Sequence, residues 1–201
     1  MKLLLIAVVG YLIGAIPFAF VIGKLFFHTD VRKHGSGNLG GSNTGRVLGK
    51  KAGVAVMTLD LLKVTLVVFL AGLIDDTALA AAVGGLSAGI GHCYPVFVRF
   101  RGGKAVAALY GFLFALWVCM GYTPMTFFVP LVTFLVVLYL FKIVSLASMI
   151  SSAAAPVLLW VIGAGGPLIL TAAVYAALII ARHHENIARL LKGEENKIRW
   201  M

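Results

Sequence analysis

Charged side chains are scarce in this chain, and acidic ones are the scarcest. Only seven of its 201 residues are Asp or Glu, and Asp, Glu, Lys and Arg together make up 12%. About a quarter of the residues in a soluble domain are charged, whereas 61% of this chain is hydrophobic. So few charged groups cannot cover so many apolar side chains in water. The composition therefore excludes a soluble globular domain and predicts an integral membrane protein.

Cysteine is also nearly absent. The chain has two, Cys93 and Cys119, which are too few for a disulfide framework and do not have the spacing of metal ligands. We interpret each as a small buried apolar residue. The sequence predicts no metal site.

Long apolar runs make up most of the chain. A membrane-spanning helix needs about 20 mostly apolar residues. Such segments lie near residues 3–23, 52–74, 78–98, 105–122, 125–141, 144–163 and 165–181. The last two are separated only by GAGGP, so the pattern alone leaves six or seven spans open. We expect a single all-α transmembrane domain over residues 1–201.

The positions of the basic residues indicate whether the number of spans is odd or even, and on which side of the membrane each terminus lies. Fifteen of the 17 Lys and Arg residues follow the first, third, fifth or seventh apolar segment, and the other junctions contain none. Cytoplasmic junctions carry the excess of Lys and Arg. This pattern predicts seven transmembrane helices, with the N-terminus outside and the C-terminus in the cytoplasm. The first segment ends in Lys24 without a small-residue cleavage site, so we do not interpret it as a signal peptide.

Polar residues gather at three of the cytoplasmic junctions, 28–51, 91–105 and 182–199. Topology explains their basic residues but not their clustered Gly, Asn, Ser and His. In the second junction, Pro95 and the Gly102-Gly103 pair forbid a continuous helix. Irregular backbone at membrane depth needs protein or water around it. This segment therefore either lines a polar cavity or forms a tight connector with an incidental histidine.

Two further patterns have more than one interpretation. Ile187, Leu190 and Leu191 alternate with polar residues and predict a short amphipathic helix on the cytoplasmic face, which is either part of the site or only a surface anchor. Asp60 and Lys63 lie three residues apart within the second span, so they share one face of a helix. Charges inside a membrane are costly and are usually functional. This pair is either functional or a mutually neutralising structural pair.

The stretch GSGNLGGSNTGR at residues 35–46 contains the pattern G-x-G-x-x-G. A dinucleotide site needs a preceding strand and an acidic residue about 20 positions later. Here a membrane span precedes the glycines, and Asp60 lies inside the next span, so the context excludes a dinucleotide site. Glycine-rich backbone and an Arg fork still suit a phosphate, and a helix N-terminus that follows favours an anion. The stretch is either an anion site or a flexible polar loop.

A second glycine pair points to the same chemistry. Gly102 and Gly103 precede Lys104 at the start of the fourth span, where we expect two free backbone amides beside an ammonium group. Two cationic, glycine-rich sites on one face indicate a ligand with two anionic groups, or two anionic ligands.

Together, these segments resemble the three cytoplasmic motifs of the bacterial acyl-phosphate:glycerol-3-phosphate acyltransferase family. GSGNLGGSNTGR, GHCYPVFVRFRGGK and HHENIARLLKGEE follow its patterns GSGNxGxTNxxR, GHxxPxxxxFxGGK and HxxNIxRLxxGxE in the same order. The departures are Ser42 for threonine, Ala105 for a common glycine, and His184 for a usual basic residue. The segment SLAS at 145–148 adds Ser145 as a candidate.

The resemblance implies a bacterial inner-membrane enzyme with its active site on the cytoplasmic side. It transfers a fatty acyl group from acyl phosphate to the 1-position of sn-glycerol 3-phosphate, giving lysophosphatidic acid and phosphate for phospholipid synthesis, without a cofactor. Acyl phosphate is activated, so no enzyme nucleophile is required. The other function considered is a transporter of phosphate or a phosphate ester, which would usually show internal repeats.

The resemblance also implies a set of site residues. One phosphate would be held by Ser36, Gly37, Asn38, Gly40, Asn43 and Arg46. The other would be held by Gly102, Gly103 and Lys104, with Ser145, Asn186, Arg189 and Glu195 completing the site. Glu195 is expected to tether the terminal helix by a salt bridge. The proton of the hydroxyl would go to His92, to His183 or to a substrate phosphate. The alternative role for His92 is to hold its loop by a hydrogen bond.

Overall fold

The computed structural model describes residues 1–198, and every regular element in that range is helical. The elements are α1 (Lys2–Gly14), α2 (Phe18–Phe27), the 3-10 helix η1 (Val31–Lys33), α3 (Gly41–Leu48), α4 (Lys50–Ile74), α5 (Ala78–Cys93), the 3-10 helix η2 (Val96–Val98), α6 (Val106–Val118), α7 (Met125–Phe141), α8 (Val144–Val161), α9 (Gly166–Arg182) and α10 (His184–Leu191). The all-α prediction is confirmed. Arg199, one of the basic residues used to predict the topology, lies outside the described range.

Several of these helices are long and apolar enough to cross a bilayer. Four stretches within residues 1–198 meet that description, and the pair α9 and α10, bent by 59°, makes a fifth if it is counted as one span. Helices α6 and α7 are apolar but shorter. These lengths support a multi-pass membrane protein, and the number seven stays a prediction.

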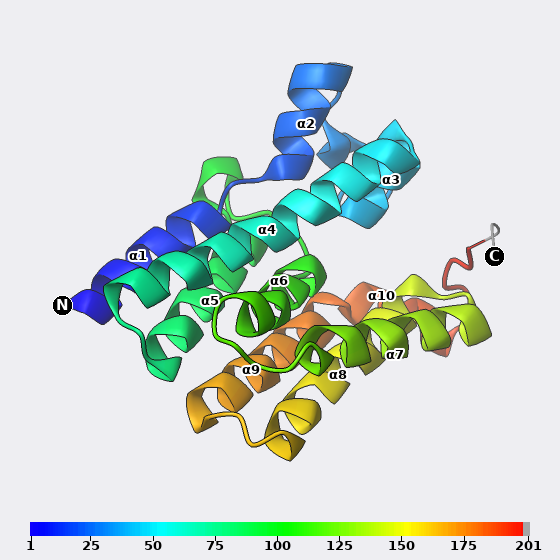
Figure 1. The fold of residues 1–201 in the computed structure, drawn as a ribbon. Helices are drawn as coiled ribbons and strands as arrows, with labels where there is room; N and C mark the ends of the chain where they lie inside the picture. Colours follow the sequence, from blue (N-terminus) through cyan, green and yellow to red (C-terminus); the bar gives the residue numbers. More distant parts are fainter. Residues whose placement is uncertain (199–201) are drawn as a thin grey trace.

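The first expected span, 3–23, is not one continuous helix. Helix α1 ends at Gly14 and α2 begins at Phe18, with Pro17 at its N-cap. Proline lacks an N–H group and disfavours helical backbone in the residue before it. The chain therefore bends here, and α2 leaves at an angle to α1 (Figure 1).

Helices α1 and α5 approach each other through small residues. A Cβ atom on Gly14 would lie 2.2 Å from the carbonyl oxygen of Ala88, and one on Gly91 would lie 2.3 Å from that of Tyr11. Larger residues at these glycines would force the helices apart. Close packing of this kind is typical of helices in membranes.

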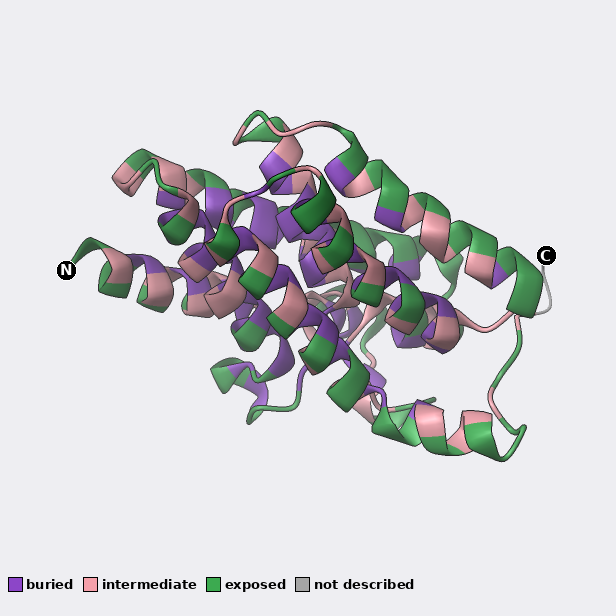
Figure 2. Ribbon diagram, turned by 90° about the horizontal axis from the view of Figure 1, so that it is seen from below, coloured by how far each residue is buried: buried purple, intermediate pink, exposed green. Residues whose placement is uncertain are grey.

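The interior of the bundle is apolar, and so are large parts of its outer surface. Phe112 of α6 stacks on Tyr175 of α9, whose hydroxyl donates to the carbonyl of Gly85 at 2.6 Å. Figure 2 shows the buried residues on the faces where the helices meet. On α4, large apolar side chains remain exposed at helical spacing: Leu62, Leu66, Phe69 and Leu73. Such an apolar stripe suits contact with lipid.

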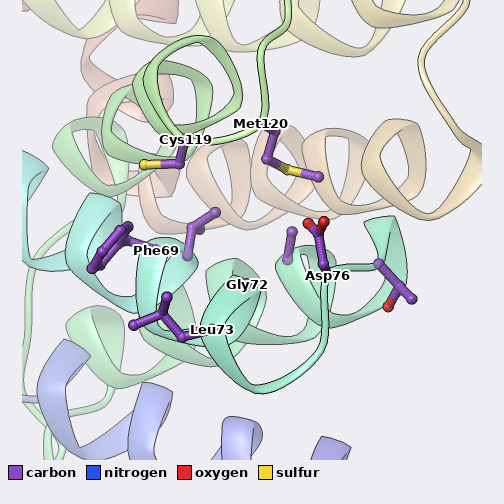
Figure 3. Close-up of a pocket in the computed structure, with 9 residues that line it drawn as sticks. Phe69, Gly72, Leu73, Asp76, Cys119 and Met120 are labelled. Atoms are coloured by element: carbon purple, nitrogen blue, oxygen red, sulfur yellow. The ribbon is translucent and has the colours of Figure 1, made fainter.

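The three motifs lie toward one end of the bundle. Helices α2, α3 and α10 are at that end, and the α4–α5 and α8–α9 connections are at the other (Figure 1). A hollow of about 250 Å³ lies away from the motifs, between the C-terminal ends of α4 and α6, where it is lined by Phe69, Asp76, Cys119 and Met120, among others (Figure 3). Cys119 is exposed and only Cys93 is buried, so the prediction of two buried cysteines is wrong for Cys119. The 91–105 segment does not line this hollow, so a polar cavity beside that segment stays a prediction.

Candidate functional site

The loop of the first motif is closed by the buried side chain of Asn43. Its Oδ1 accepts a hydrogen bond from the Ser36 amide at 2.8 Å, and its Nδ2 donates to the carbonyls of Val31 and His34 at 3.0 and 3.2 Å. Gly35 lies against this amide with a φ of 61°, and a Cβ atom there would be 2.3 Å from Oδ1. Asn43, which sequence analysis assigned to phosphate binding, is therefore engaged in shaping the loop.

The same loop leads into the N-terminus of α3. Gly40 caps this helix without a side-chain bond, and Thr44 bonds back to its carbonyl oxygen. Within residues 1–198, the amides of Gly41 and Ser42 have no hydrogen-bond partner. Open first-turn amides and the helix dipole attract anions. Arg46 is exposed on this helix, and its Nε lies 3.3 Å from the Ser42 carbonyl oxygen.

The second motif folds back on the end of α5. The Gly102 amide donates to the carbonyl of Cys93 at 3.1 Å, and the Gly103 amide donates to that of His92 at 3.0 Å. These two amides were expected to be free for a phosphate, and that expectation is wrong because they cap α5 instead. A Cβ atom on Gly102 would lie 2.1 Å from the His92 carbonyl oxygen, so only glycine fits this turn.

The end of the second motif has left-handed backbone at residues other than glycine. Ala105, the N-cap of α6, has a φ of 61°, and Arg99 and Phe100 are at 58° and 60°. Glycine adopts this conformation without strain. This backbone explains why glycine suits position 105.

Helix α9 holds the same turn from the other side. Arg182 donates to the carbonyls of Gly102 and Gly103 at 3.2 and 3.3 Å, and its guanidinium lies 5.3 Å from the centre of the Tyr94 ring. Sequence analysis counted Arg182 only as a marker of topology. Its position directly before the third motif was the available signal for this role.

His183 follows Arg182 and is buried. Its Nδ1 lies 2.7 Å from the carbonyl oxygen of Ile179. A carbonyl oxygen only accepts, so Nδ1 carries the proton and Nε2 presents a lone pair. Burial lowers the pKa of His183 to about 4, so the ring is neutral at pH 7. This state is compatible with the predicted role of a base.

The second and third motifs meet in a polar network around Glu195. Lys104 Nζ donates to Asn186 Oδ1. Glu195 Oε1 accepts from Asn186 Nδ2 at 2.6 Å and from Ser145 Oγ at 2.8 Å, and Oε2 accepts from Arg189 Nε at 2.7 Å. The predicted salt bridge of Glu195 is confirmed with Arg189 as its partner. Three other predicted residues thus meet at one carboxylate, and Lys104 joins them through Asn186.

The surroundings shift the pKa values of the charged groups in this network. Burial lowers the pKa of Lys104, because the ammonium group loses water. Burial raises the pKa of Glu195, but hydrogen bonds from Asn186, Arg189 and Ser145 outweigh it and hold the pKa below its ordinary value. Glu195 is therefore a carboxylate at neutral pH. A poorly hydrated ammonium group beside it is well suited to a second anion.

The loop of the first motif adjoins the second motif through apolar contacts. Val31 and Leu39 of the first motif loop pack with Val98 of η2 in one buried cluster. Within residues 1–198, no hydrogen bond or ion pair joins Ser36 or Arg46 to the network of the second and third motifs. The structure thus has two separate groups of anion-binding candidates rather than one.

Asp60 and Lys63 form a buried ion pair of 2.7 Å next to the second motif. Asp60 Oδ1 also lies 3.4 Å from His92 Nδ1. Sequence analysis considered a functional pair and a neutralising pair without foreseeing this contact, because it depends on how α4 and α5 pack.

Comparisons with known proteins agree with one another. A family model described as glycerol-3-phosphate acyltransferase matches residues 4–193. The glycerol-3-phosphate acyltransferase of Bacillus cytotoxicus is 43% identical over 96% of this chain and 93% of its own, and that of Staphylococcus haemolyticus is 40% identical over the whole of both chains. Crystal structures of PlsY, an integral membrane glycerol 3-phosphate acyltransferase, match 99% of this chain and 96% of theirs. The glycerol 3-phosphate form has a TM-score of 0.91 at 38% identity, and the lysophosphatidic acid form has 0.89 at 36%.

Proposed function

Because the chain belongs to the glycerol-3-phosphate acyltransferase family, we propose that its three motifs bind glycerol 3-phosphate and an acyl phosphate together. The chain transfers a fatty acyl group to the 1-hydroxyl of glycerol 3-phosphate, and lysophosphatidic acid and phosphate are the products. The observation that carries this conclusion is the match to PlsY in forms with glycerol 3-phosphate and lysophosphatidic acid. A transporter function has no support among the relatives, which are acyltransferases.

The reaction needs positioning more than it needs a nucleophile. The hydroxyl oxygen of glycerol 3-phosphate attacks the acyl carbon, the bond from that carbon to the phosphate oxygen breaks, and phosphate leaves. The hydroxyl proton passes to a base. Two anionic substrates repel each other, so cations and backbone dipoles must bring them to reacting distance.

The geometry supports a division of labour among the predicted residues. The open amides of α3, with Ser36 and Arg46, suit one phosphate. Lys104 and Arg189 suit the other. A phosphate bound by Lys104 and Arg189 competes with the Glu195 carboxylate for the hydrogen bond that Arg189 donates. Asn43, Gly102 and Gly103 act by shaping their loops, because their amide groups are engaged within the protein.

The activity has a direct test. Purified protein is mixed with palmitoyl phosphate and glycerol 3-phosphate, and free phosphate and lysophosphatidic acid are measured. We expect phosphate release that depends on glycerol 3-phosphate, with equal amounts of the two products. Palmitoyl-coenzyme A in place of palmitoyl phosphate serves as the control and should give no product. A lack of phosphate release dependent on glycerol 3-phosphate would contradict the proposed function.

We further propose seven membrane spans in a bacterial inner membrane, with the N-terminus outside and the motifs in the cytoplasm. In this arrangement α1 and α2 together count as the first span and α4 to α9 supply the other six. The support is the distribution of Lys and Arg: within residues 1–198, all of them except Lys2 and Lys63 lie at the end of the bundle that carries the motifs, and the α4–α5, α6–α7 and α8–α9 connections contain none.

Single cysteines test this orientation. In a Cys119→Ser background, Asp76→Cys is expected to react with a membrane-impermeant maleimide in intact spheroplasts. Lys51→Cys and Lys192→Cys are expected to react only after lysis. All three side chains are exposed, so a missing reaction reports the side of the membrane. The reverse pattern would refute the orientation.

A further inference from the structure

Two buried charges on α4 lie beside the break between α1 and α2. Asp60 Oδ1 and Lys63 Nζ are 2.7 Å apart, and both side chains are 3% exposed. Burying an ion pair inside a membrane protein is costly, and apolar side chains of the same volume would fill the space without that cost. Mutual neutralisation therefore does not by itself explain why the pair is present.

Lys63 holds the break between α1 and α2. Its ammonium group donates to the carbonyl of Ile16 at 2.9 Å and lies 5.6 Å from the centre of the Phe18 ring, at the start of α2. Pro17, between these two residues, has no N–H group and begins α2 without a side-chain cap. The bonds from Lys63 therefore fix the direction in which α2 leaves α1.

Helix α2 in turn supports the first motif. Its Ala19 lies in one buried cluster with Val31 of η1, and the guanidinium of Arg32 lies 4.6 Å from the centre of the Phe20 ring. The Val31 carbonyl accepts from Asn43, which closes the loop of the first motif. A change in the direction of α2 would therefore displace η1 and the loop that follows it.

The second motif lies on the other side of Asp60. Asp60 Oδ1 is 3.4 Å from Nδ1 of His92, in the last turn of α5. A carboxylate only accepts, so Nδ1 carries the proton. The ring packs against the glycine turn, where a Cβ atom on Gly103 would lie 2.0 Å from Nε2, and the Gly103 amide donates to the His92 carbonyl at 3.0 Å. Asp60 thus holds the residue on which the turn before Lys104 is folded.

We propose that Asp60 and Lys63 are positioning residues that set the spacing between the two groups of anion-binding candidates. Lys63 places the first motif through the break, and Asp60 places the second motif through His92. This inference rests on the proposed function. The hydroxyl of one substrate must meet the acyl carbon of the other, and a displacement of about 1 Å can cost about 100-fold in rate. In this role neither side chain contacts a substrate.

Lys63→Met combined with Asp60→Asn tests the hold on the break. Methionine cannot donate to the Ile16 carbonyl, whereas asparagine needs no charged partner and still accepts from His92. We expect kcat to fall at least about tenfold, with KM for glycerol 3-phosphate and the inhibition constant of inorganic phosphate within about twofold of the wild type. Each phosphate keeps its own ligands, and the spacing matters only when both substrates react. A wild-type kcat, or a loss confined to KM, would overturn the proposal.

A second variant covers the case in which the first does not fold. Asp60→Leu combined with Lys63→Met replaces both charges by apolar side chains of similar volume, which a neutralising pair tolerates. We expect a folded protein with kcat at least about tenfold below that of the wild type, since the contacts on both sides are lost. A kcat near that of the wild type would show that the pair is only structural.

Distances between spin labels test the spacing directly. In a Cys119→Ser background, labels at Lys33→Cys of η1 and Lys192→Cys after α10 report where the first motif lies relative to the third; both side chains are exposed. We expect the distance distribution from double electron–electron resonance to shift or broaden in these variants. Labels at Lys51→Cys, on α4, and Lys192→Cys are the control and should keep their distance. An unchanged distribution from Lys33→Cys would overturn the proposal.

Thr65→Val is the matched control on the same helix. Thr65 is buried, and its hydroxyl donates to the carbonyl of Gly111, away from the break. We expect a lower Tm with unchanged kcat. If the wild type itself gives no phosphate release dependent on glycerol 3-phosphate, the proposed function fails. If the wild type is active and the variants of Asp60 and Lys63 match its kcat, this inference alone fails.

Discussion

Lys104→Ala is expected to lower kcat/KM by about 10³-fold, the upper range for removing one group that stabilises developing charge. Lys104 ends the second motif and its ammonium group bonds to Asn186 of the third, and its partial burial leaves it poorly hydrated. Within residues 1–198, no cation other than Lys104 bonds to Asn186. The measurement is phosphate release at varied concentrations of each substrate.

The variant should still fold, because Lys104 makes a polar contact at the edge of the network and not in the apolar core. Lys192→Ala serves as the control: it removes an exposed lysine just after α10 and should leave activity unchanged. Lys104→Ala with more than a tenth of wild-type activity would show that the second phosphate is held elsewhere.

Arg46→Ala is expected to lower kcat/KM by about 100-fold, the value of losing a strong charged hydrogen bond of about 3 kcal/mol. The guanidinium is exposed on α3, whose first amides are open. If this group binds one phosphate in the ground state, the loss should appear mainly as a higher KM for one substrate. The substrate whose KM rises is the one bound by the first motif.

Arg46→Lys should recover only part of this loss, because lysine keeps the charge but not the planar fork. Lys51→Ala removes another exposed cation nearby and should have little effect. If Lys51→Ala and Arg46→Ala behave alike, the first motif acts only through general positive charge.

Local rules in the sequence predicted much of the fold. Pro95 and the Gly102-Gly103 pair indicated that no continuous helix crosses the second motif, and in the structure residues 94–105 lie outside the α-helices. Pro17 carried an equally local signal, yet the apolar run around it favoured one unbroken span. Hydrophobicity predicts which residues lie in the membrane. The break between α1 and α2 depends instead on backbone hydrogen bonds, which hydrophobicity does not describe.

The site was harder to predict, because its details depend on tertiary contacts. Gly102 and Gly103 fit a phosphate cradle by type, but their amides cap α5 once the chain turns back on it. Asn43 fits a ligand by type, but it bonds to its own loop. The contact of Asp60 with His92 arises because α4 and α5 lie side by side, and no spacing in the sequence encodes it.

Glu195 has a consequence for the biosynthesis of this protein. The carboxylate that holds Ser145, Asn186 and Arg189 together comes after the last helix, α10. Beyond it, the amide of Ile198 bonds to the carbonyl of Lys142, which ties this stretch to the turn between α7 and α8. A nascent chain thus inserts every helix before its polar network can close. Released chains that are truncated before residue 195 would have every helix from α1 to α10 but not the carboxylate that assembles the site.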